Sequence, residues 1–219
     1  MSFHNTSPGA APSASHVPAV SDQGLLRGAL GLAIVCVLGF GVLYPLAGVG
    51  LGQALFPHPA NGSLIERDGQ VVGSSLVAQP FADDRYFQSR PSAAGFNAMA
   101  LSGSNQARTN PDLRQRIEQA RVAVAIREGV DPAAVPSDLV TQSGGGIDPH
   151  ISPEAAAIQI ERVARARGID RKLVEGLVAR HTEQPQFGLL GKHRVQVLAL
   201  NLALDALADA HPQAPSVKP

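Results

Sequence analysis

The sequence contains a single cysteine, Cys36, and has no block of basic residues. One cysteine cannot form an internal disulfide, so core packing and neighbouring molecules must stabilise the folded part of the chain. Lysine plus arginine equals aspartate plus glutamate at 18 each. Because the phosphate backbone of a nucleic acid is held by clustered basic side chains, we expect no nucleic-acid partner.

Motifs that would indicate catalysis or nucleotide binding are also missing. There is no Gly-x-Ser-x-Gly turn to hold a nucleophilic serine, and no Gly-x-x-x-x-Gly-Lys-Ser/Thr loop to bind phosphates. His150, His181 and His193 lack the i, i+4 spacing with which a helix presents two metal ligands. We therefore expect no catalytic residue, no metal site and no cofactor of the chain's own. The sequence has no internal repeat.

What the sequence does contain is an apolar run from Gly28 to Leu55, without a charged residue and with Gln53 as its one strongly polar side chain. A helix needs about 20 apolar residues to cross a bilayer core, and this run exceeds that length. We predict a transmembrane helix over residues 24–55, with the lipid bilayer as a partner. A cleaved signal peptide is the alternative, but the run is about twice the usual length of its apolar region.

Glycines punctuate this run at helical spacing. Gly24 and Gly28 are four residues apart, as are Gly48 and Gly52. Small residues at this spacing let a second membrane helix approach closely, so these four are candidate helix-packing residues; a lone anchor is the other interpretation. Pro45 removes one helical hydrogen bond and predicts a kink.

Arg27 stands just before the run, and no lysine or arginine follows until Arg67. Positive residues favour the cytoplasmic side, so this asymmetry predicts a cytoplasmic N-terminus and an extracytoplasmic domain. Residues 56–209 are numerous enough to form one domain with a core of its own. The flanking residues 1–23 and 210–219 are predicted to be disordered tails, the first of them cytoplasmic.

The predicted fold class is α+β: one N-terminal transmembrane helix, then a single small mixed α/β extracytoplasmic domain. Asp68-Gly69 suits the tight turn of a β-hairpin over residues 63–77. Residues 80–109 form a long polar and aromatic segment without a periodic pattern. Helices are predicted over residues 111–128, 153–168, 171–181 and 194–208, with a strand at 195–197 as the alternative start of the last.

The candidate chemistry is sparse. Asp148 and His150 follow the flexible glycines 144–146, and with Ser143 they suggest a hydrolase triad. A triad needs its base within hydrogen-bond distance of a rigidly held nucleophile, which this spacing does not favour, so a turn closed by Asp148 is the preferred interpretation. Five arginines are interpreted as a solvated helix face: Arg162, Arg165, Arg167, Arg171 and Arg180.

Several ordered stretches resemble one protein family. They are Tyr44 to Leu46, Asn61 to Ile65, Tyr86 to Ala93 (with Tyr86, Phe87, Arg90, Pro91 and Ser92), Gly103 to Asn105, Thr109 to Pro111, Val135 to Thr141, Asp148 to Pro153 (with Asp148, Pro149 and His150), Gln159, Arg162 to Ala164, and Val197 to Asp205 (with Asn201). Through them the chain resembles the C subunit of the Kdp potassium-transporting ATPase. Arg162 and Asn201, which are polar residues within apolar runs, are then expected to be buried and hydrogen-bonded.

This resemblance implies a non-catalytic accessory subunit of a potassium-uptake complex in the cell inner membrane. Its implied partners are a channel-like subunit that carries potassium and a P-type ATPase subunit that hydrolyses ATP, so ATP and potassium are handled by the complex. The family is described as a catalytic chaperone that raises the ATP affinity of the pump subunit.

Four residues match the stretches associated with the nucleotide: Ser102, Gly103, Asn105 and Gln159. The predicted orientation places them outside the cell, away from cytoplasmic ATP, which favours an assembly or stabilising role. The alternative function is a membrane-anchored extracytoplasmic hydrolase that uses Asp148 and His150.

Overall fold

The computed structural model describes residues 24–210 of the chain. The tails predicted for residues 1–23 and 210–219 lie outside the described residues, except for residue 210. The chain divides into two compact units, one up to Pro57 and one from His58 onward, and each is described by itself.

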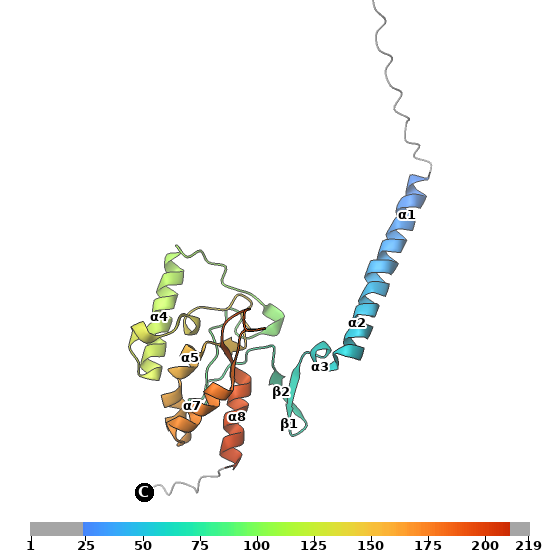
Figure 1. Cartoon of the computed structure of the whole chain (residues 1–219). Coiled ribbons are helices and arrows are strands. Elements are labelled where there is room, and N and C mark those ends of the chain that lie inside the picture. The colour runs from blue at the N-terminus through green and yellow to red at the C-terminus, as the bar shows by residue number, and fades with distance from the viewer. Residues whose placement is uncertain (1–23, 211–219) are drawn as a thin grey trace, which may run out of the picture. The chain divides into compact units, whose positions relative to one another are not determined.

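The first unit is a continuous helix (Figure 1) of 31 residues, Leu25–Leu55. It contains an 18-residue window with a mean hydropathy of 2.3, and is long and apolar enough to cross a membrane. Its parts are α1 (Leu25–Cys36), the π-helical η1 (Val37–Leu43) and α2 (Tyr44–Leu55). Pro45 lies at the start of α2, and the Tyr44 N–H bonds the carbonyl of Gly39. The proline thus follows a stretch of wider helix that rearranges the backbone hydrogen bonds.

The predicted glycine pairs have different positions in this helix. Gly24 precedes the first helical residue with φ of 112°, so the helix begins one residue later than predicted and Gly24 is its cap. At Gly28 and Gly48 an added Cβ would meet no atom within 4 Å, so both remain open to a partner helix.

The boundary between the units falls within the short helix α3 (Pro57–Ala60), and the second unit continues with the predicted hairpin, which is confirmed. β1 (Leu64–Arg67) pairs with β2 (Gln70–Ser74) in antiparallel register, with a bulge at Ile65/Glu66. Asp68 and Gly69 form the turn with φ of 54° and 74°, a conformation that glycine and aspartate tolerate.

The rest of the second unit is mainly helical. The elements after the irregular segment, which contains only η2 (Ala98–Ala100), are α4 (Pro111–Glu128), η3 (Pro132–Ala134), η4 (Ser137–Leu139), β3 (His150–Ile151), α5 (Pro153–Ala157), α6 (Ile160–Arg167), α7 (Arg171–Arg180), β4 (Thr182–Glu183), β5 (Arg194–Gln196) and α8 (Val197–Ala210). The last three strands form a small antiparallel sheet of order β3-β5-β4, and α5 and α8 contact its central strand. The helices α7 and α8 lie side by side (Figure 1).

Two predicted helices differ in their limits. The helix expected over 153–168 is interrupted at Ile158 and Gln159, where α5 ends and α6 begins. The helix expected from 194 begins at Val197, because residues 194–196 pair with both other strands, as the alternative allowed.

The core of this unit joins the helices to the irregular segment. Phe87, which lies in that segment, is fully buried among side chains of α5, α6, α7 and α8. The largest fully buried apolar side chains are Phe87, Ile151, Val163, Val174, Val195, Val197, Leu200 and Leu204. The segment is therefore an integral part of the domain despite its lack of regular structure.

Candidate functional site

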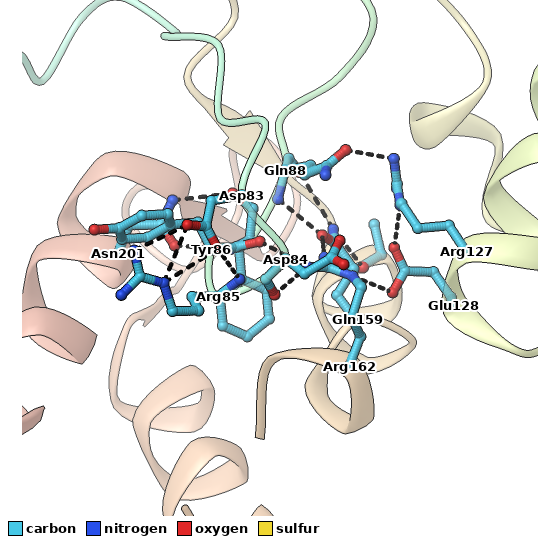
Figure 2. A network of polar contacts seen from close by, with 12 residues as sticks. Asp83, Asp84, Arg85, Tyr86, Gln88, Arg127, Glu128, Gln159, Arg162 and Asn201 are labelled. Atoms are coloured by element: carbon cyan, nitrogen blue, oxygen red, sulfur yellow. Dashed lines mark hydrogen bonds and ion pairs between the residues drawn. The ribbon is translucent and has the colours of Figure 1, made fainter. Parts of the chain in front are cut away.

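A network of buried and half-buried polar groups holds residues 84–88. We call it the central polar network: the backbone of Asp84 to Gln88 with the side chains of Gln88, Arg127, Glu128, Gln159, Arg162 and Asn201 (Figure 2). It surrounds Tyr86 and Phe87, which belong to one of the stretches that resemble the family, Tyr86 to Ala93.

Asn201 on α8 binds the backbone of Phe87 through both ends of its side-chain amide. The Phe87 N–H donates to Oδ1 at 2.8 Å, and Nδ2 donates to the Phe87 carbonyl at 2.9 Å. The amide thus replaces the strand partner that an irregular segment lacks. Asn201 is 1% exposed, so the expected buried position is confirmed.

Gln159, at the break between α5 and α6, binds the backbone of Gln88 in the same manner. Its Oε1 accepts from the Gln88 N–H and from Arg162 Nη2, each at 2.8 Å. Its Nε2 donates to the carbonyls of Gln88 at 3.2 Å and Ala155 at 3.1 Å. An amide offers two acceptor and two donor positions, so the hydrogen-bonding capacity of this fully buried side chain is used up.

Arg162 and Glu128 form the charged part of the network. Arg162 Nε donates to Glu128 Oε2 at 2.9 Å, with side-chain exposures of 5% and 0%. Arg162 Nη1 donates to the carbonyls of Asp84 at 2.6 Å and Tyr86 at 3.0 Å. Arg127 Nε reaches Glu128 Oε1 at 2.6 Å and its Nη1 contacts Gln88 Oε1, so the carboxylate is shared by two guanidinium groups (Figure 2).

A second set of contacts fixes Tyr86. Its hydroxyl donates to Asp205 Oδ2 at 3.2 Å, and Arg167 lies over its ring with Cζ 4.8 Å from the centroid. Arg167 Nη2 also donates to Asp205 Oδ1 at 2.8 Å. Stacking and ion pairing together make this a well-defined position for the tyrosine ring.

The prediction of a solvated arginine face was therefore wrong for two of its five members. Arg162 is buried in the network, and the side chain of Arg167 is only 7% exposed beside Asp205. Arg165 and Arg180 are exposed, and Arg171 pairs with Glu161 and Glu175 at the surface. Of these five arginines, only Arg162 was also expected to be buried, because it lies within an apolar run of the sequence.

Asp148 and His150 form a structural turn. The His150 N–H donates to Asp148 Oδ1 at 3.0 Å, which is the turn that the sequence favoured, and Arg90 Nη1 donates to Oδ2 at 2.9 Å. Burial alone would raise the pKa of Asp148, but hydrogen bonds from the side chain and backbone of His150 and the contact with Arg90 outweigh it and bring the pKa to about 2. Pro149 accepts a hydrogen bond from the Val197 N–H.

The hydrolase triad is not assembled among the described residues. Ser143 is buried at 4% exposure, and its carbonyl accepts from the Gly146 N–H. Ser92 Oγ donates to the Gly146 carbonyl at 2.5 Å, while Pro91 beside it is partly buried.

Within residues 24–210, no group of three or more metal-binding side chains occurs, and His193 Nε2 lies 2.7 Å from Gln184 Oε1.

The four residues that only the family resemblance linked with the nucleotide lie in two separate settings. An added Cβ on Gly103 would lie 2.8 Å from the Gly144 carbonyl oxygen, so the loop of Ser102, Gly103 and Asn105 packs on the glycines 144–146. Gln159 instead contacts Gln88, and no contact described for residues 24–210 joins it to that loop.

A polar cleft of about 820 Å³ opens beside Arg90. Its lining residues are Arg90, Pro136, Ser137, Asp138, Thr141, Ser152, Pro153, Glu154, Pro185, Gly191, Lys192 and His193. A smaller hollow of about 340 Å³ shares five of these residues and reaches Asp148 and His150. Charges of both signs line the cleft, which suits hydrogen bonding to a polar, neutral group.

Five side chains of the site were not predicted from the sequence to take part in these contacts: Gln88, Arg127, Glu128, Arg167 and Asp205. Glu128 ends an otherwise ordinary helix and gives no pattern that would indicate burial. Asp205 offered a usable signal, because it is an acidic residue within an apolar helix.

Comparisons with known proteins agree with the resemblance. A family model described as "KdpC: K+-transporting ATPase, c chain" matches residues 26–206. The potassium-transporting ATPase KdpC subunit of Xanthomonas campestris pv. campestris is 55% identical over 191 residues, covering 87% of this chain and 91% of the relative. Those of Xanthomonas oryzae pv. oryzae and Methylococcus capsulatus are 58% and 56% identical, over 84% and 82% of this chain and 88% and 96% of the relative.

Proposed function

The chain belongs to the KdpC family, the c chain of the potassium-transporting ATPase, and we propose that it is a single-pass accessory subunit of a potassium-uptake complex in the inner membrane. It is not the catalytic subunit. In this proposal the channel-like subunit carries potassium and the P-type ATPase subunit hydrolyses ATP, so this chain needs no cofactor of its own. Its domain lies outside the cell, as the position of Arg27 predicts.

The observation that carries the proposal is that the polar residues in the stretches resembling the family are occupied by hydrogen bonds within the domain. Gln159, Arg162 and Asn201 form hydrogen bonds with the backbone of residues 84–88. Gln159 also bonds Arg162 and Ala155, and Arg162 also bonds Glu128. A catalytic group must keep a lone pair or a proton available for substrate. Groups that are buried and bonded to the chain itself instead fix the shape of the domain, which suits a subunit that acts by binding its partners.

The same observation bears on how the chain would support ATP use. Gln159 is fully buried and has no hydrogen bond left to offer a nucleotide. A higher ATP affinity of the pump subunit would therefore arise by coupling, with the chain binding one conformational state of the complex more tightly than another.

The test measures potassium-stimulated ATP hydrolysis by detergent-solubilised complex with and without this chain. We expect hydrolysis at low ATP concentration to fall at least tenfold without it, and recovery by His150→Gln to within twofold of wild type, because the imidazole is not catalytic. Hydrolysis that is unchanged when the chain is absent would refute the accessory role.

A second variant separates coupling from direct contact. Gln159→Ala leaves buried partners of the amide unsatisfied, so we expect less assembled complex but an ATP KM within twofold of wild type in the complexes that form. A raised KM with unchanged thermal stability and yield would instead indicate that Gln159 contacts the nucleotide.

A further inference from the structure

The loop between β4 and β5 presents three large apolar side chains to solvent. Phe187, Leu189 and Leu190 are 83%, 86% and 61% exposed. Isolated exposed apolar residues are common, but three of them within four positions of one loop form a patch that needs an explanation. We call residues 185–191 the apolar loop.

The apolar loop is closed by its own backbone hydrogen bonds. Gln186 and Leu190 exchange two N–H···O bonds of 2.8 and 2.9 Å, and the Gly188 N–H donates to the Pro185 carbonyl at 2.9 Å. Phe187 has φ of 56°, which is unfavourable for a side chain of this size. The fold thus accepts local strain in a closed loop that holds the phenyl ring away from the core.

Polar groups adjoin the apolar loop on one side. Pro185 and Gly191 line the cleft described above, together with Asp138 and Glu154. Arg90 also lines it, and its Nε is buried without a hydrogen-bond partner among the described residues. The two ends of the apolar loop therefore border a cleft that offers hydrogen-bonding groups.

Charges of both signs lie at the base of the apolar loop. Arg194 pairs with Glu183 at 2.8 Å. Lys192 is exposed, and Asp138 and Glu154 bring negative charge to the cleft. These carboxylates are repelled by an anionic lipid surface, and acyl chains cannot satisfy the polar groups of the cleft. A polypeptide can do both, because it brings apolar side chains together with backbone N–H and C=O groups.

We propose that the apolar loop and the adjoining cleft are a docking surface for an uncharged polypeptide segment of another subunit of the complex. Phe187 and Leu189 are the apolar centre of this contact, and the cleft is its polar rim. The proposal rests on the proposed function, because it assumes a complex with partner subunits.

The test uses the whole complex. The chain carries an affinity tag and the substitutions Phe187→Asn with Leu189→Ser, where asparagine tolerates the positive φ. The matched control is Ile126→Gln on α4, which removes a side chain of similar exposure, 77%, in a different region. We expect the loop variant to retain at least tenfold less partner subunit during purification, and the control to stay within twofold of wild type.

A photo-crosslinking residue, p-benzoylphenylalanine, in place of Phe187 identifies the occupant. We expect an adduct with another subunit, and none from the same residue in place of Ile126. Adducts only with lipid or with a second copy of this chain would overturn the proposal, as would equal retention by the loop variant and the control. If even the wild-type chain retains no partner, the proposed function fails as well, so the two failures are distinguishable.

Discussion

Glu128 is a carboxylate with no exposed surface that balances two arginines. Its oxygens lie 2.9 Å from Arg162 Nε and 2.6 Å from Arg127 Nε. Such a group is stable in the interior only while its partners remain, because an unpaired buried charge is costly. The stability of the domain therefore depends on Glu128 and its two arginine partners, which lie beside residues 84–88.

Loss of Arg162 should test this dependence. We expect Arg162→Leu to lower the free energy of unfolding by about 3–5 kcal/mol, because it leaves Glu128 buried without its main partner. Thermal or denaturant unfolding of the full chain in detergent measures the effect.

The control is Arg165→Leu, an exposed arginine on the same helix, for which a change within about 0.5 kcal/mol is expected. Adding Glu128→Leu to Arg162→Leu should recover part of the loss, since no charge is then left unpaired. Equal effects of the two arginine variants would contradict the burial argument.

Asp148 should give the domain a pH-dependent stability. Its pKa of about 2 in the folded state lies below the value of about 3.9 in an unfolded chain. The ionised form therefore stabilises the fold fully above about pH 4, and this contribution is lost as the pH falls towards 2. Because the side chain is 33% exposed, we expect only about 1 kcal/mol.

The measurement compares wild type with Asp148→Asn between pH 2 and 6. The difference in unfolding free energy should be largest at pH 5–6 and shrink towards pH 2. A difference that stays constant over this range would mean that the Asp148 carboxylate is not held in its ionised form by Arg90 and His150.

At the scale of elements, side chains replace regular backbone pairing. The segment before α4 contains no strand after β2, and its backbone is held by Gln159 at the α5–α6 break and by Asn201 on α8. The break between α5 and α6 therefore contributes to the fold, because it places Gln159 beside the backbone of Gln88.

Close backbone packing also positions the loop around Gly103. A Cβ there would lie 2.8 Å from the Gly144 carbonyl oxygen, a contact that backbone atoms cannot easily relieve, while a Cβ on Gly145 would meet no atom within 4 Å. We expect Gly103→Ala to lower the unfolding free energy by about 1–3 kcal/mol and Gly145→Ala to change it by less than about 0.5 kcal/mol. Similar melting temperatures for the two variants would contradict the close packing of Gly103 against the Gly144 carbonyl.

At the scale of the whole molecule, the chain combines a long apolar helix with a domain whose described part contains no disulfide. The one cysteine lies in that helix. The accessory role requires the domain to face the compartment in which its contacts with partner subunits form, so its orientation is the property to measure first.

A single cysteine reports that orientation. Ser137 is exposed, so Ser137→Cys in a Cys36→Ser background should react with a membrane-impermeant thiol reagent added to intact cells. The positive-inside asymmetry around Arg27 is the physical reason. The Cys36→Ser chain alone should stay unlabelled. Labelling only after permeabilisation would reverse the orientation and expose the loop of Ser102 to Asn105 to cytoplasmic ATP.

The sequence by itself determined the long apolar helix, the hairpin at Asp68-Gly69 and the existence of most helices. These features depend on local properties: the length of an apolar run, the φ preference of a turn residue, and capping residues such as Asn110, whose side chain accepts from the Asp112 N–H. The family resemblance came from short ordered stretches and could be recognised in the same way.

Only the tertiary structure decided what the buried polar residues contact, and that Glu128 and Arg167 are among them. Glu128 and Arg162 are 34 positions apart, and Phe87 and Asn201 are 114 positions apart. No local pattern encodes such pairs, because each residue is stable in the interior only through a partner that the fold brings from elsewhere. For the same reason the sequence placed Arg167 in solvent, whereas the fold places it between Tyr86 and Asp205.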